Sequence, residues 1–190
     1  MSYRALYDSI QPLPVHIRRK LIRTKVQEIA EAPGIQVLAS ALDTRSVRGF
    51  YVSPRNVNHP LVKQFGRHVI VVARGLNRCW TRFIMVKELM HLLDEVEEAT
   101  DTGDEFETML SELNVPSKEK SPQTLAELKA FWMALGVLCP ENIRLELQRE
   151  REEGRIDDYS IALRLRIPEA YVHNLFTPRY SVNIQAIIGG

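Results

Sequence analysis

An apolar strand followed closely by an amphipathic helix is the pattern that most constrains the fold of this chain. Residues 68–73, HVIVVA, are continuous and rich in β-branched residues, which predicts a buried strand. Gly75 breaks this run, and Asn77 is of a type that begins helices. Over 78–98 the apolar residues then recur at helical spacing. The order predicts an α+β protein in which a small sheet accompanies a long helix.

Apolar spacing and helix-breaking residues predict the remaining elements. We expect further strands over 35–38 and 49–52, and helices over 14–32, 125–138, 141–153, 157–165 and 168–176. The segment 94–107 is strongly acidic and has no basic residue, which indicates a solvated helix end and loop. The proline-containing stretch 114–124 predicts a linker. It divides the chain into an N-terminal part, 1–113, and a C-terminal part, 125–190.

Composition excludes several classes of protein. Of the 190 residues, 45% are apolar and 26% are charged, and the net charge is +1, so a polybasic nucleic-acid binder is not indicated. No apolar run approaches the roughly 20 residues that span a bilayer, and residues 1–11 do not resemble a signal peptide. Cys79 and Cys139 lie far apart in apolar surroundings, which favours two reduced thiols. We therefore expect a cytoplasmic protein with no membrane association.

The helix predicted over 78–98 carries an incomplete metal-binding pattern. A zinc-binding helix of this type places two histidines four residues apart on one face, with a glutamate beside the first as general base. Glu88 and His91 stand at the glutamate and second histidine positions, and Lys87 replaces the first histidine. A protonated lysine has no lone pair and cannot ligate Zn²⁺. The helix therefore predicts the scaffold of a hydrolase without its metal.

Three sequence blocks occur in a specific order. The first combines the strand 69–73 with RFIMVKELMHLL at 82–93 and is similar to the motif R-F-T-x-A-H-E-L-G-H-L-L. The second, ELKAFWMALGVLCP at 127–140, is similar to E-x-E-A-x-x-F-A-x-x-L-L-x-P, and the third, 161–172, resembles a short helix-turn-helix tail. Together they resemble the ImmA/IrrE family of zinc metallopeptidase-like proteins. The resemblance covers about residues 14–176. It implies a zincin-like domain, with a small sheet and an active-site-type helix, followed by a C-terminal helical, helix-turn-helix-like subdomain.

The resemblance implies a metal site in which two ligand positions are changed. Lys87 stands at the first histidine position, and Lys129 stands where the family has an acidic third ligand. His91 is then the one ligand kept, and Glu88 keeps the general-base position without activity. One interpretation is that the two ammonium groups replace the charge of the metal, with Glu88 as counter-ion. The other is that both lysines reach solvent. Two further pocket neighbours are expected, Asp94 and Glu127.

These residues lead us to expect a non-catalytic regulatory or protein-interaction module, and the resemblance associates it with phage or mobile-element regulation. Its partner would be a protein or peptide, including a transcriptional regulator, and neither metal nor other cofactor is expected. On this interpretation zinc binding would return only after Lys87 and Lys129 were both replaced by ligands. One alternative is an active metallopeptidase that holds zinc and cleaves a repressor-type regulator. A second is a DNA-binding regulator, but 168–174 carries no lysine or arginine, so no nucleic-acid partner is expected.

Overall fold

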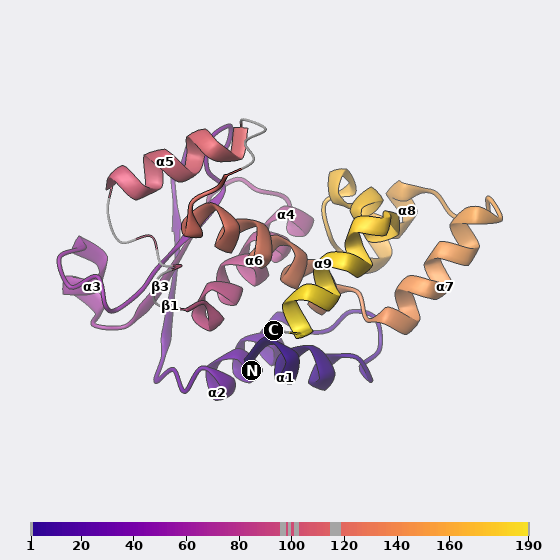
Figure 1. Cartoon of the computed structure of the whole chain (residues 1–190), viewed down its shortest axis with the longest axis horizontal. Coiled ribbons are helices and arrows are strands. Elements are labelled where there is room, and N and C mark those ends of the chain that lie inside the picture. The colour runs from indigo at the N-terminus through magenta and orange to yellow at the C-terminus, as the bar shows by residue number, and fades with distance from the viewer. Residues whose placement is uncertain (1, 96–97, 99, 101–102, 115–118, 190) are drawn as a thin grey trace.

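The protein is α+β, with a three-stranded mixed sheet among mostly helical elements (Figure 1). The computed structural model describes residues 2–95, 98, 100, 103–114 and 119–189. Strand β3 (His68–Ala73) lies at the centre of the sheet, parallel to β1 (Ile35–Ser40) and antiparallel to β2 (Gly49–Val52). All three predicted strands are confirmed, and β1 is two residues longer than expected.

Strand β3 is buried on both faces, as its apolar run predicts. Ile70 and Val72 belong to the main core, which the helices share. Val69 and Val71 point the other way and pack in a smaller cluster that includes Val62 of α3 (Pro60–Phe65), a helix that the sequence analysis missed. Because side chains alternate along a strand, one six-residue segment supports two separate apolar layers.

Helix α4 (Arg78–Met90) follows β3 after a short turn and packs against the sheet. The side chain of Asn77 caps it by accepting the backbone N–H of Trp80 at 3.0 Å, as expected for this residue type. The helix is shorter than the predicted 78–98, because it ends at Met90 and a 3-10 turn, η1 (His91–Leu93), follows. Negative charge opposes the negative end of the helix dipole, so the acidic run after Leu93 is a poor continuation of the helix.

The N-terminal segment contains a helix that was not predicted, α1 (Ser2–Ile10), which buries Leu6 and Ile10 completely. Helix α2 (Arg19–Ile29) begins five residues later than the predicted 14–32, after an irregular stretch that includes Pro14. His16 in this stretch has a φ of 72°, which lies outside the right-handed helical region, so the helix can begin only after it.

The C-terminal part is entirely helical over its described residues. Helix α5 (Gly103–Asn114), which precedes this part, was not predicted, and it begins within the acidic segment 94–107 that we expected to be a helix end and loop. Helix α6 (Pro122–Leu138) follows the predicted linker 114–124, of which 115–118 lie outside the described residues and 122–124 are helical. Four elements follow: α7 (Glu141–Glu152), α8 (Asp158–Leu165), the 3-10 segment η3 (Glu169–Phe176) and α9 (Pro178–Gly189), the last of which was not predicted. No helix in the described part of the chain combines the length and apolar character needed to cross a membrane.

The two ends of the chain meet on α6. Both α1 and α9 contact it, and the Tyr3 hydroxyl of α1 donates to the Met133 carbonyl of α6 at 3.2 Å. Figure 1 shows the two termini close together, with α4 and α6 between the sheet and the helices α7 to α9. The main core therefore includes side chains from both predicted parts of the chain. Helices α4 and α6 also carry the polar residues of the candidate site.

Candidate functional site

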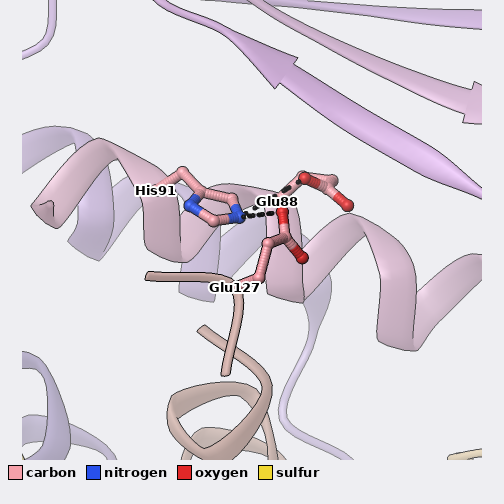
Figure 2. A group of neighbouring side chains, drawn as sticks. All are labelled: Glu88, His91 and Glu127. Atoms are coloured by element: carbon pink, nitrogen blue, oxygen red, sulfur yellow. Dashed lines mark ion pairs between the residues drawn. The ribbon is translucent and has the colours of Figure 1, made fainter. Parts of the chain in front are cut away.

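Helices α4 and α6 pack against each other and bring together four charged residues of the sequence analysis. Lys87 and Glu88 lie at the end of α4, His91 lies in η1, and Glu127 lies on α6. Figure 2 shows the imidazole of His91 pointing toward the carboxylates of Glu88 and Glu127. These side chains are 0–21% exposed. Ionic interactions in such a site are much less screened by water and salt than those at a surface.

Lys87 is the central cation of this group. Its Nζ donates to Oε2 of Glu127 at 2.5 Å and lies 2.9 Å from Oε1 of Glu88. Burial acts to lower the pKa of Lys87, but the charges of Glu127 and Glu88 outweigh it and raise that pKa above its usual range. Lys87 therefore does not reach solvent as a free surface charge. It holds two carboxylates that come from different helices.

His91 is a second cation in the same group. Its Nε2 lies 3.1 Å from Oε1 of Glu127 and 3.7 Å from Oε2 of Glu88, while its Nδ1 lies 2.6 Å from Oδ2 of Asp94. Burial acts to lower the pKa of His91, but Glu127 and Asp94 outweigh it and raise that pKa to about 10. The imidazole is thus protonated at neutral pH, and both ring nitrogens carry hydrogen.

The two glutamates differ in their response to this environment. Burial acts to raise the pKa of Glu127, but Lys87 and His91 outweigh it and lower that pKa well below its usual range. For Glu88 burial prevails, and its pKa is raised despite the opposing charge of Lys87. Neither oxygen of Glu88 receives a well-formed hydrogen bond from the described residues. Glu88 is therefore stabilised by charge alone, which is a costly arrangement for a fully buried carboxylate.

The structure corrects the expected place of Lys129. Its Nζ lies 2.7 Å from Oε2 of Glu98 and 3.6 Å from Oδ1 of Asp94, so it belongs to a neighbouring ionic group. Glu127, which we expected only as a pocket neighbour, lies opposite Lys87 and His91 instead. The physical reason is helical geometry, because two residues that are two apart on one helix do not share a face. Asp94 is a pocket neighbour as expected, and it links the two groups.

The sequence resemblance implies zinc as the cofactor of the family, so the question is whether these residues could bind a zinc ion. Glu88, His91 and Glu127 can each offer one ligand atom, and these atoms lie within 4.8 Å of one another. However, the ammonium of Lys87 already pairs with both carboxylates, and a protonated imidazole has no lone pair to donate. These residues do not fit Zn²⁺ at neutral pH while Lys87 remains in place.

A cavity of about 550 Å³ opens beside the charged group. His91, Asp94 and Glu127 line its floor, and strand β2 contributes one wall. On that wall Tyr51 stacks at 6.2 Å from the ring of His91, and its hydroxyl lies 2.7 Å from Nδ1 of His68. His68 was not among the site residues expected from the sequence. It could not place His68 beside Tyr51, because that pair forms only when β2 and β3 align.

Comparisons of this chain with protein-family models, curated proteins and solved structures found no match. The resemblance to the ImmA/IrrE family therefore stays a prediction from the sequence.

Proposed function

We propose that the chain is a non-catalytic relative of the ImmA/IrrE metallopeptidases and acts as a regulatory or protein-interaction module. Within this proposal, β1 to β3 with α4 form a zincin-like core, and α8 with η3 forms a helix-turn-helix-like tail. The observation that carries the proposal is the Lys87 ammonium, which lies 2.9 Å from Glu88 and 2.5 Å from Glu127. A positive charge is thus built into the site by the chain itself.

The chemical consequence follows from the nature of an ammonium group. A catalytic zinc ion binds water in an open coordination position and lowers its pKa to near neutrality. An ammonium can balance the charge of two carboxylates, but it cannot coordinate and activate water in this way. Glu88, paired with Lys87, serves as a counter-ion and not as a general base. On this proposal, Lys87 balances the charge of the two carboxylates, but the site cannot catalyse hydrolysis.

The cavity beside β2 is the part of the site that a partner would use. Strand β2 pairs with β3 on one side and forms one edge of the described sheet. An extended peptide can add to such an edge through its main chain, while its side chains enter a neighbouring pocket. The cavity of about 550 Å³ adjoins this edge and offers both apolar walls, such as Phe50, and polar groups, such as His68. We therefore propose a protein or peptide segment as the ligand, and a transcriptional regulator as one class of partner.

One observation favours a second function. The three donor atoms of Glu88, His91 and Glu127 lie close enough for a single ion. If a metal displaced Lys87, the chain would be a zinc metallopeptidase with an unusual ligand set, acting on a repressor-type regulator. The close pairing of Lys87 with both carboxylates opposes this displacement.

Elemental analysis of the purified chain separates the two functions. We expect no stoichiometric zinc and the same melting temperature with and without a chelator, because Lys87 supplies the charge that a metal would bring. A peptide selected from a random library should bind equally well with chelator and should protect amide hydrogens of β2 from exchange. Close to one zinc per chain, or peptide binding that a chelator abolishes, would favour the peptidase.

A further inference from the structure

The cavity beside β2 is lined by more negative than positive groups. Four carboxylates contribute to its lining, those of Asp94, Glu95, Glu98 and Glu127. The ammonium groups of Lys87 and Lys129, which pair with some of these carboxylates, belong to residues outside the lining. On the positive side the lining has one permanent cation, the exposed Arg55, and the imidazolium of His91. The cavity therefore favours a positively charged ligand over a negative one.

Asp94 is the buried carboxylate of this lining, and one of its oxygens is unused. Its side chain is 5% exposed, and its Oδ2 lies 2.6 Å from Nδ1 of His91. Its Oδ1 accepts no hydrogen bond from the described residues, because Nζ of Lys129 is 3.6 Å away, too far for one. A buried carboxylate oxygen without a donor is unfavourable. The lining thus lacks a hydrogen-bond donor at Asp94, which a ligand in the cavity can supply.

Glu98 and Glu95 add negative charge beside Asp94. Oε2 of Glu98 accepts from Nζ of Lys129 at 2.7 Å and from the backbone N–H of Glu95 at 2.9 Å. Asp94 and Glu98 therefore converge, since both lie within 3.6 Å of one ammonium. Glu95 is exposed and forms no ion pair with the described residues. All three belong to the segment 94–107, which contains eight acidic residues and no basic one. One internal lysine leaves this group with an excess of negative charge.

Apolar side chains form much of the remaining lining, among them Tyr51 of β2, Leu92 and Met109 of α5. A volume of about 550 Å³ is typical of a ligand site. Apolar walls that lead to carboxylates suit a side chain with a hydrocarbon stem and a positive end. A compact ammonium suits them better than a planar guanidinium, because Lys87 and Lys129 already show that carboxylates here hold ammonium groups in pairs.

We propose that the cavity binds the side chain of a lysine in the partner peptide, with its ammonium among Asp94, Glu95 and Glu98. The peptide adds to the edge of β2, and the stem of its lysine packs against the apolar lining. Lys87 and Lys129 keep their places, and the new ammonium balances the remaining negative charge. This inference rests on the proposed function, because it names the residue that the proposed peptide presents.

Three heptapeptides test the proposal on the full chain. Each is acetylated and amidated, alternates threonine with valine, and differs only at its centre, which is lysine, acetyl-lysine or glutamate. Acetylation removes the charge of the lysine but keeps its stem. By isothermal calorimetry at constant ionic strength we expect the lysine peptide to bind about tenfold more tightly than the acetyl-lysine peptide, the effect of one charge-assisted hydrogen bond, and the glutamate peptide not to bind. Equal affinity for lysine and acetyl-lysine, or tighter binding of glutamate, would overturn the proposal.

The same peptides separate this inference from the function on which it rests. If the lysine and acetyl-lysine peptides bind equally and both protect amide hydrogens of β2 from exchange, the lysine pocket is refuted and the peptide partner stands. If none of the three binds, the lysine pocket is again refuted. The proposed function fails as well only if selection from the random library also gives no peptide.

Substitutions locate the ammonium. Glu95→Gln removes an exposed charge, so this variant should fold normally, lose about fivefold in affinity for the lysine peptide and bind the acetyl-lysine peptide as before. Glu152→Gln removes the same charge from an exposed glutamate of α7, far from the sheet in Figure 1, and should change neither affinity. Equal losses in these two variants would show a non-specific charge effect and refute the site. Asp94→Asn should weaken binding of the lysine peptide further, and if it does not fold, the Glu95 and Glu152 pair still decides the question.

Discussion

At the scale of single residues, Lys87 determines the character of the polar site. Its side chain is 13% exposed and pairs with Glu88, which is fully buried, and with Glu127 of another helix. Removing one member of a buried ionic group leaves the others without compensation, and this loss exceeds the net value of the intact pair. Lys129 offers a matched comparison, since it is a more exposed lysine, at 26%, with its own two carboxylates.

We predict that Lys87→Met lowers the free energy of unfolding by about 3–5 kcal/mol, because it removes the close cation partner of buried Glu88 and leaves Glu127 paired with His91 alone. Lys129→Met should cost less, about 1–2 kcal/mol, because Lys129 and Glu98 are more exposed than Lys87 and Glu88. Urea denaturation of both variants at pH 7 measures the difference. Similar losses would mean that Lys87 is no more important than an ordinary surface lysine.

The ionisation of His91 should make stability depend on pH. Its pKa is raised from 6.5 in a model peptide to about 10 in the folded protein. The folded state therefore holds the proton more tightly, so the stabilising contribution is complete below about pH 6.5 and is lost as pH rises toward 10. In contrast, burial and the charge of Arg55 lower the pKa of His68.

An NMR titration of the two imidazoles tests this assignment. We expect the resonances of His91 to remain those of a protonated ring through pH 8, and those of His68 to titrate below pH 6.5. His91→Gln should flatten the decline of unfolding free energy between pH 7 and pH 10. A His91 that titrates near 6.5 would show that its carboxylate partners are not engaged in solution.

The position of Glu127 changes what is needed to build a zinc site. From sequence we expected two substitutions to be required, but the acidic group already lies opposite His91. We now predict that Lys87→His alone gives measurable zinc binding by calorimetry, because it removes the competing ammonium and adds a ligand. Adding Glu127→Gln to this variant should abolish that binding. Zinc uptake by Lys87→His combined with Lys129→Glu, but not by Lys87→His alone, would restore the original ligand assignment.

At the scale of elements, the close approach of β2 to α4 positions the cavity wall over the charged group. Gly49 begins β2, and a Cβ at this position would collide with Ile84 of α4 and lie 2.9 Å from the carbonyl oxygen of Val71. The absence of a side chain is therefore what allows the strand to lie so close to the helix.

We predict that Gly49→Ala lowers the free energy of unfolding by about 1–3 kcal/mol, the usual range for an overpacked site. Gly34→Ala is the control, because a Cβ there would meet only the flexible side chain of Arg67, at 3.6 Å or more. Urea denaturation should show little change for the control. If both variants were equally stable, β2 and α4 would have to be farther apart in solution.

At the scale of the whole molecule, the N-terminal helix and the C-terminal helix complete one core around α6. Leu6 of α1 is fully buried in this core, together with side chains from α6 and α9. Such an arrangement couples the two ends of the chain, because loss of either helix exposes apolar surface of the other.

We predict that Leu6→Ala lowers the free energy of unfolding by about 2–5 kcal/mol through the cavity that it leaves. Val182→Ala on α9, where the valine is 68% exposed, should change the free energy of unfolding by less than about 0.5 kcal/mol. Tryptophan fluorescence, which comes from Trp80 on α4 and Trp132 on α6, and far-ultraviolet circular dichroism should report the same transition. Two separate transitions would indicate that the parts 1–113 and 125–190 unfold independently.

Local pattern alone was enough to predict the three strands and most of the helices. The β-branched run at 68–73 and the helical spacing after Asn77 depend only on neighbouring residues, so the strand and the start of the helix could be predicted from the sequence. It also identified Lys87, Glu88 and His91 as one group, since helical spacing places them within one turn. The helices α1, α3, α5 and α9 were missed, because local pattern did not show which of their apolar residues would be buried against other elements.

Tertiary structure decided which distant residues join that group. Glu127 and Lys129 are nearly adjacent in sequence, but the packing of α6 against α4 turns only Glu127 toward Lys87. In the same way, the sequence does not show that Arg82 of α4 donates a hydrogen bond to the carbonyl of Ile17, just before α2, because the two residues meet only in the fold. Spacing along one helix is fixed by backbone geometry, whereas contact between helices depends on how their apolar faces fit. For this reason the sequence determined most of the elements and the charges, and the fold determined which charges meet.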